Sequence, residues 1–228
     1  MLGRSTDVRS WRPQRFGRRA ARHVDDPLVE PLWSGIRVLA HVSPDGVEML
    51  DAEGGVQQWP DVAADLISAV EPSTAVLDGY LTTEASESGA VEAVPPVRPP
   101  SPVQMARQLL WFGGSANRRT ELIDALEEQL PRAFAPGEEV VFVAVDMLAI
   151  DGEPLLDVPL LERKRLLESV LRERDRARHG MYIRPPVGVW VTTWRTLGFR
   201  SMAYKEANGR YVPGEPNEGW AQARIPDR

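Results

Sequence analysis

The sequence predicts an α+β fold, in which strands and helices follow one another without regular alternation. Short runs rich in β-branched and apolar residues indicate strands over 36–42, 47–50, 75–82 and 140–150. Apolar residues recur at helical spacing over 60–70, after Pro159 and over 187–197. Because no strand–helix unit repeats along the chain, a doubly wound parallel sheet is not expected.

The first half of the chain contains a predicted hairpin, a helix and a buried strand. Ser43-Pro44-Asp45-Gly46 has the composition of a turn, so the strands 36–42 and 47–50 are expected to form a hairpin. The helix 60–70 follows, and then the strand 75–82, which contains the pair Asp78-Gly79.

A proline- and serine-rich segment occupies the middle of the chain. Residues 83–102 read TEASESGAVEAVPPVRPPSP, which is typical of an exposed loop or linker. Two amphipathic helices are expected after it, over 103–111 and 122–130, with Gly113-Gly114 between them.

The second half alternates long apolar segments with charged ones. The strand 140–150 is apolar throughout and is expected to be buried on both faces. A helix of about five turns is expected after Pro159, with Lys164 exposed on it. The helix 187–197 precedes a final β region over 199–225. The residues of this helix expected to face inward are Trp190, Val191 and Trp194.

The composition is that of a globular protein. Of the 228 residues, 43% are hydrophobic, 26% are charged and none is cysteine. The three histidines show no ligand spacing. No run approaches the ~20 apolar residues of a membrane span, and the N-terminus carries no secretory signal. We therefore expect a cytoplasmic protein without a membrane partner.

Arginines are concentrated in the first 25 residues, although the formal net charge of the whole chain is −6. This segment is interpreted as a basic, flexible arm that precedes a domain over 26–228. A basic arm can contact the phosphates of DNA, and a solvated tail is the alternative. The arginines expected to bind DNA are Arg12, Arg15, Arg18 and Arg19.

Five segments carry a resemblance to a known family. In chain order they are EPLWSGIRV, VLDGYLT, FVAVDMLAIDGEPLLDVPLLERKRLL, LGFRSMAYK and RYVPGEPNEGWAQARI. Together they resemble the motifs of the adenylation domain of ATP-dependent DNA ligases, especially the bacterial end-joining type. The resemblance implies an ATP-grasp-like nucleotide-binding domain with two antiparallel sheets flanked by helices around a cleft. Because the chain stops after the last motif, no appended OB domain is expected.

The chain departs from the family pattern at the positions that carry chemistry. In the family, a lysine amine attacks the α-phosphate of ATP, and Leu32 stands at that position here. Arg200 replaces a metal-binding carboxylate. The other replacements are Ser34 for an aspartate, Tyr80 for a glutamate, Val145 for an adenine-stacking aromatic residue, and Gln222 and Arg224 for two phosphate-binding lysines.

These departures decide which site residues remain. The only lysines are Lys164 and Lys205, and Lys205, the family's second lysine, is the remote substitute for the nucleophile. No metal site is predicted, so ATP or AMP would bind without Mg²⁺. The residues that the resemblance assigns to nucleotide or phosphate are Glu30, Gly35, Arg37, Arg200, Lys205 and Arg224.

Three functional hypotheses stay open. The first is a pseudo-ligase that does not self-adenylate but keeps a scaffold for a nucleotide, DNA or a repair protein in DNA repair or end joining. The second is an active ATP-dependent polynucleotide ligase or nucleotidyltransferase with altered catalytic residues. The third is a protein-interaction module, in which the arm and the loop 83–102 recruit partners.

Overall fold

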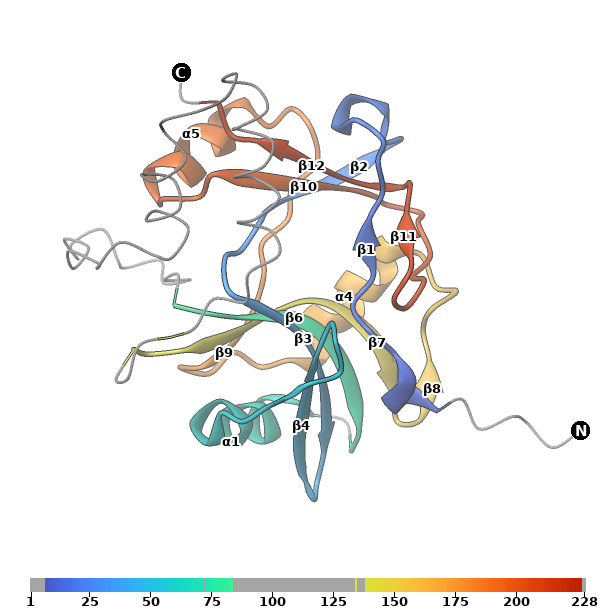
Figure 1. The fold of residues 1–228 in the computed structure, drawn as a ribbon, viewed down its shortest axis with the longest axis vertical. Coiled ribbons are helices and arrows are strands. Elements are labelled where there is room, and N and C mark those ends of the chain that lie inside the picture. Colours follow the sequence, from blue (N-terminus) through green and yellow to red (C-terminus); the bar gives the residue numbers. More distant parts are fainter. Residues whose placement is uncertain (1–6, 72, 84–133, 135–137, 227–228) are drawn as a thin grey trace, which may run out of the picture. The chain divides into compact units, whose positions relative to one another are not determined.

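A computed structural model describes residues 7–71, 73–83, 134 and 138–226 of the chain. The chain divides into one unit formed by residues 1–86 and 134–228 and another formed by residues 87–133. All the described residues belong to the first unit, which is shown in Figure 1. The predicted helices 103–111 and 122–130, and nearly all of the predicted loop 83–102, lie outside the described residues.

The larger sheet of this unit is almost entirely antiparallel and has the strand order β5-β4-β3-β6-β7-β8. Its short seventh strand, β9, pairs with β7 in parallel. The strands are β3 (Ile36–Ser43), β4 (Gly46–Asp51), β5 (Val56–Gln57), β6 (Ala75–Thr82), β7 (Val141–Ile150), β8 (Glu153–Pro154) and β9 (Ala177–His179). The four strands predicted over 36–42, 47–50, 75–82 and 140–150 are therefore confirmed.

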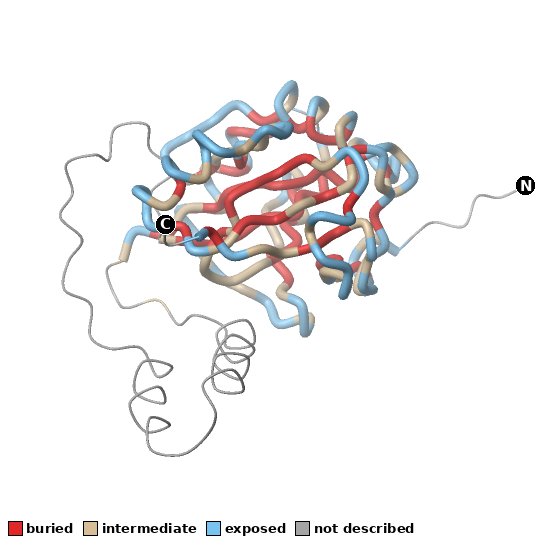
Figure 2. Tube along the Cα trace, turned by 90° about the horizontal axis from the view of Figure 1, so that it is seen from above, coloured by how far each residue is buried: buried red, intermediate tan, exposed pale blue. Residues whose placement is uncertain are grey.

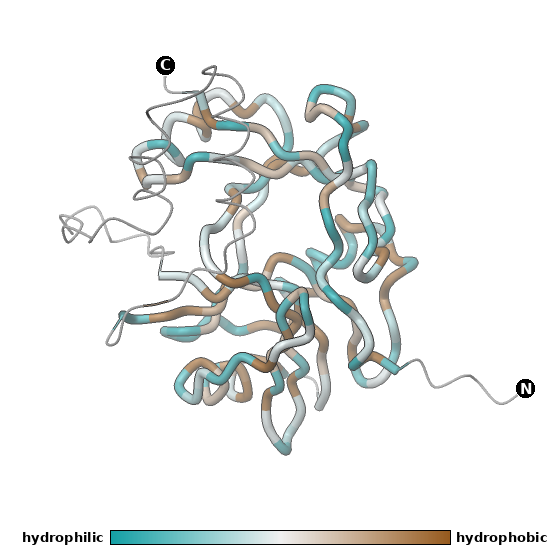
Figure 3. The backbone as a smooth tube through the Cα atoms, in the orientation of Figure 1, coloured by the Kyte–Doolittle hydropathy of each residue, from teal (hydrophilic) through white to brown (hydrophobic). Residues whose placement is uncertain are grey.

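Two helices cover one face of this sheet. The predicted helix 60–70 is confirmed as α1 (Pro60–Ala69), and the helix after Pro159 is α4 (Leu160–Val170). Their apolar side chains and those of β3, β6 and β7 form one continuous core. Figure 2 shows that the central strands are buried almost throughout. In Figure 3 hydrophobic residues lie along these strands, whereas the tip of the β3–β4 hairpin is hydrophilic.

The prediction of five turns for α4 is wrong. The helix has 11 residues. It ends because Leu171 forms a bridge with Val70, and because the N–H of Arg172 donates to the carbonyl of Ala69. The backbone groups that follow α4 therefore find hydrogen-bond partners at the end of α1. A longer helix would lose these partners.

A smaller antiparallel sheet has the order β12-β10-β2. Its strands are β2 (Pro27–Pro31), β10 (Ser201–Glu206) and β12 (Trp220–Arg224). The predicted helix 187–197 is confirmed as α5 (Gly188–Thr196), and Trp194 packs from it into the same cluster as Met202 of β10. Trp190, expected to face inward, is 42% exposed, whereas Trp194 is buried and Val191 is partly buried against the same cluster, as expected.

The N-terminal segment, interpreted from the sequence as a flexible arm over 1–25, packs on the domain over residues 8–24. They form η1 (Val8–Ser10), β1 (Arg15–Phe16) and η2 (Ala21–His23), and β1 pairs in parallel with β11 (Pro216–Asn217). Trp11 is buried and packs with Tyr211 and Trp220. The aromatic residues between the arginines bind the segment to the core by burying apolar surface.

Candidate functional site

A carboxylate shared by two lysines lies between the two sheets. Glu30 comes from β2, Lys205 from β10 and Lys164 from α4. Lys164 Nζ lies 2.8 Å from Glu30 Oε1. Lys205 Nζ donates a hydrogen bond to Glu30 Oε2 at 2.9 Å. No side chain of the three is more than 3% exposed, so both ion pairs are shielded from water.

The expectation that Lys164 is exposed is wrong. Its ammonium group donates to the carbonyl of Val145 at 2.8 Å and lies 4.9 Å from the ring centroid of Tyr182. The buried face of α4 consists of Leu160, Arg163, Lys164 and Leu167. Two of these four residues are basic, because this face of the helix meets carboxylates as well as apolar side chains.

The electrostatics of this trio follow from burial and charge. Burial opposes the ionisation of Glu30, but the charges of Lys164 and Lys205 outweigh it and lower the pKa of this carboxyl. Burial lowers the pKa of Lys205, which Glu30 opposes and the neighbouring charge of Lys164 reinforces. Glu30 is therefore held ionised.

A second ion pair, whose carboxylate is fully buried and whose guanidinium is 15% exposed, joins β3 to β6. Arg37 donates from Nε to Asp78 Oδ1 at 3.0 Å and from Nη2 to Oδ2 at 2.6 Å. Its Nη1 donates to the carbonyl of Gln14 at 2.6 Å, and the hydroxyl of Tyr211 donates to Asp78 at 2.8 Å. Burial opposes the charge of Arg37, but Asp78 raises its pKa well above the ordinary value.

Trp220 connects these two groups. Its indole ring lies 4.3 Å from the ammonium of Lys205 and 5.4 Å from the guanidinium carbon of Arg37, and the residue is fully buried. Cations at these positions are attracted to the aromatic ring. The smaller sheet, which holds Trp220, is thereby linked to the larger sheet, which holds Arg37.

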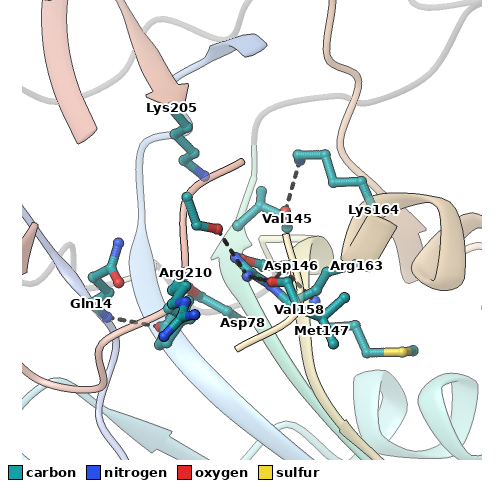
Figure 4. A network of polar contacts seen from close by, with 12 residues as sticks. Gln14, Asp78, Val145, Asp146, Met147, Val158, Arg163, Lys164, Lys205 and Arg210 are labelled. Atoms are coloured by element: carbon teal, nitrogen blue, oxygen red, sulfur yellow. Dashed lines mark hydrogen bonds and ion pairs between the residues drawn. The ribbon is translucent and has the colours of Figure 1, made fainter. Parts of the chain in front are cut away.

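A third ion pair belongs to the same network. Arg163 donates from Nε to Asp146 Oδ1 at 2.8 Å and from Nη2 to Oδ2 at 2.7 Å, and neither side chain is exposed. Figure 4 shows this pair and the neighbouring hydrogen bond from Lys164 to the carbonyl of Val145. Sequence reasoning assigned no role to Gln14, Asp146 or Arg163. The carboxylate of Asp146 inside the apolar run FVAVDMLAI was the available signal, because a buried carboxylate requires a partner.

Leu32 and Gly35 lie just before β3. Leu32 is half-buried and packs against the cluster that contains Trp33, Tyr80 and Val145. Gly35 has φ +128°, and a Cβ there would lie 2.0 Å from the carbonyl oxygen of Leu81. The backbone itself therefore requires glycine at this position.

The other predicted residues lie outside the buried network. Arg200 and Arg224 are exposed at the ends of β10 and β12, which pair Ser201 with Arg224. The guanidinium of Arg12 lies against Gly54, in the turn between β4 and β5. Arg15 donates to the carbonyl of Gly214 at 3.1 Å.

Arg18 and Arg19 lie beside an acidic residue. Their backbone N–H groups donate to the two carboxylate oxygens of Glu218 at 3.2 and 3.1 Å. Both arginines are exposed, as are Arg15 and Arg22. The structure thus groups Arg15, Arg18 and Arg19 along one packed segment and places Arg12 at a different turn.

Within residues 7–71, 73–83, 134 and 138–226, no three histidine, aspartate or glutamate side chains come together as metal ligands would. A surface hollow of about 480 Å³ lies at the β3–β4 hairpin, where Val8, His41 and Glu48 contribute to its lining. None of the predicted site residues lines it. No helix in the described part of the chain has the length and apolarity needed to cross a membrane.

Comparisons with known proteins agree with this arrangement of sheets. No protein-family model matches the chain. A DNA ligase of Thermococcus fumicolans is 22% identical over 198 residues, which are 84% of this chain and 31% of that ligase. The chain therefore spans less than a third of this curated relative.

Solved structures give the stronger likeness. The ligase domain of M. tuberculosis LigD has a TM-score of 0.62 at 18% identity, with 96% of this chain and 60% of that chain covered. A mycobacterial DNA ligase D complexed with ATP and MES has a TM-score of 0.63 at 18% identity, with 96% and 61% covered. A Lig E DNA ligase has a TM-score of 0.51 at 11% identity, with 93% and 68% covered.

Proposed function

Since the chain has the adenylation-domain fold of ATP-dependent DNA ligases of the bacterial end-joining type, we propose that it is a DNA ligase-like protein that binds DNA without adenylating itself. Its activity as a ligase would require a nucleophilic amine, and its DNA binding would require exposed cations. In our proposal, the lysines of this chain do not meet the first requirement, whereas its exposed arginines meet the second.

The engagement of every lysine amine in the chain carries the proposal. Adenylation requires an unprotonated amine that can reach the α-phosphate of ATP. Leu32, at the position of the family's nucleophile, has an aliphatic side chain. Lys164 and Lys205 are the only lysines, and both are buried against Glu30. These contacts support a protein that cannot form a lysine–AMP bond.

The residues at the family's metal positions do not fit Mg²⁺. This ion requires oxygen ligands in a nearly octahedral array. Arg200 places a guanidinium at the beginning of β10, where the resemblance expects a carboxylate, and a cation there repels a divalent ion. At this position the chain therefore offers Mg²⁺ no carboxylate ligand.

DNA binding is proposed through the packed arginine segment. Arg15, Arg18, Arg19 and Arg22 are exposed, and Glu218 fixes the backbone that carries two of them. Arginines held in place lose less conformational entropy on contact with phosphates than arginines on a mobile tail. The Lig E structure concerns DNA binding with a minimal scaffold, and we propose the same partner here, in DNA repair or end joining. A repair protein is a further proposed partner.

Self-adenylation is tested with α-labelled ATP and Mg²⁺, followed by denaturation and measurement of the retained label. We expect no label on this protein, while a LigD ligase domain treated in parallel retains AMP. Peptide mapping identifies the site of any label. A stoichiometric adduct on either lysine would establish the alternative, an active nucleotidyltransferase with non-standard catalytic residues.

A further inference from the structure

We infer that ATP and AMP do not bind between the two sheets, because the chain's own ion pairs occupy the groups that a nucleotide would use. The inference rests on the proposed function and goes further, since a protein that does not adenylate itself could still hold ATP. It is an alternative to the expectation that ATP or AMP binds here without metal. The ionic network of Glu30, Lys164, Lys205, Arg37 and Asp78 carries the argument.

Glu30 is the first obstacle to a phosphate. Its carboxylate contacts both lysine ammonium groups, at 2.8 and 2.9 Å. A phosphate that approached Lys205 would therefore come within a few ångströms of an ionised carboxylate. In a buried region the repulsion between two anions is screened far less than in water. Displacing Glu30 instead would leave a buried carboxylate without its partners.

Trp220 also packs against the ammonium group of Lys205. The ammonium lies 4.3 Å from the indole centroid, so Glu30 and Trp220 flank the same charge. Arg37 is similarly committed, because its fork binds Asp78 and its third contact is the carbonyl of Gln14. Its guanidinium also lies 5.8 Å from the ring of Tyr80. The two interior cations assigned to phosphate by the resemblance are thus both paired within the chain.

Among the described residues, the position that the resemblance assigns to adenine stacking offers no aromatic surface. Val145 stands where the resemblance expects an aromatic residue that stacks on adenine, and it is 1% exposed. Trp33 and Tyr80 in the same cluster are 7% and 9% exposed, so their rings are covered by protein. Trp33 packs edge-on against Phe199 at 4.9 Å between centroids. A purine would have to displace this cluster before it could stack.

An acyl phosphate of ATP tests the inference, because it transfers its acyl group to a lysine amine beside the bound phosphates. The chain has two lysines, so peptide mass spectrometry can measure acylation at every lysine side chain. We expect neither Lys164 nor Lys205 to be acylated in the native protein and both to react after denaturation in urea. A LigD ligase domain serves as the positive control. Acylation of either lysine that excess ATP suppresses would overturn the inference.

Calorimetry provides a second measurement that does not depend on lysine reactivity. The full chain is titrated with ATP, AMP and inorganic triphosphate to millimolar concentration, with and without Mg²⁺. We expect no saturable heat specific to the nucleotides. Saturable binding of ATP or AMP that triphosphate does not reproduce would overturn the inference, while the absence of a covalent adduct would leave the proposed function intact. A covalent lysine–AMP adduct would instead overturn the proposed function itself.

Discussion

At the level of single residues, one carboxylate, that of Glu30, pairs with two buried lysines. Removing its charge is therefore expected to cost more stability than removing any other single charge of the network. In Glu30→Gln both ammonium groups would remain buried without their anion. Breaking a buried ion pair in this way costs about 3–5 kcal/mol. We expect a loss of this size in the free energy of unfolding, measured by urea denaturation.

The matched control is Glu215→Gln. Glu215 is 68% exposed and lies 3.9 Å from Arg15, so we expect a change below about 1 kcal/mol. Equal losses for the two variants would show that the lysine trio contributes nothing beyond an ordinary surface pair.

Acid should weaken the contribution of Glu30. The pKa of Glu30 is lowered from its ordinary value of 4.5, so the folded state binds its proton less readily than the unfolded state does. The stability that it contributes is therefore fully present above 4.5 and is lost as pH falls through the lowered folded pKa. We expect the stability difference between the wild type and Glu30→Gln to be constant near neutrality and to shrink in acid. A difference that grows in acid would contradict the assigned direction.

At the level of elements, the N-terminal segment belongs to the fold. Trp11 is 6% exposed, and the backbone of Gln14 contacts both Tyr211 and Arg37. Trp11→Ala should lower the free energy of unfolding by about 3–5 kcal/mol, as truncation of a buried tryptophan does elsewhere. The control is Trp190→Ala on α5, where the side chain is 42% exposed and the expected loss is below about 1 kcal/mol. Urea denaturation measures both, and a small effect at Trp11 would restore the interpretation as a flexible arm.

The elements also show which local patterns predict structure well. The strands β3, β4, β6 and β7 and the helices α1 and α5 were predicted within a few residues. The helices show apolar residues at helical spacing, and the strands are short runs rich in apolar and β-branched residues. The length of α4 was wrong, because a backbone contact with α1 ends it at a point that the sequence does not mark.

At the level of the whole molecule, a basic segment that binds DNA must do so on a chain whose net charge is negative. The chain carries a net charge of −6, so DNA contact depends on the arginine segment rather than on the average field. Binding to a nicked duplex should weaken as salt rises. In the double variant Arg18→Ala, Arg19→Ala, the slope of log K against log salt should fall by about 0.9 for each lost phosphate contact.

Arg165→Ala is the control for this measurement. Arg165 is 60% exposed and pairs with Glu162 on α4, on a different element from the arginine segment. We expect its salt slope to equal that of the wild type. An unchanged slope in the double variant, or salt-independent binding, would exclude DNA contact through Arg18 and Arg19 and leave the proposed repair protein as the partner.

The sequence alone determined the α+β class, the main strands and the ligase resemblance, because these depend on local periodicity and on the order of short motifs. It also determined that Leu32 offers no nucleophile, since that is a property of one side chain. Only the tertiary structure decided that Lys164 is buried, that the N-terminal arginine segment is packed, and that Glu30 serves two lysines. Glu30 and Lys205 are separated by 175 residues along the chain. Whether such charges meet depends on how the sheets pack, because an ion pair is defined by distance in space rather than by distance in sequence.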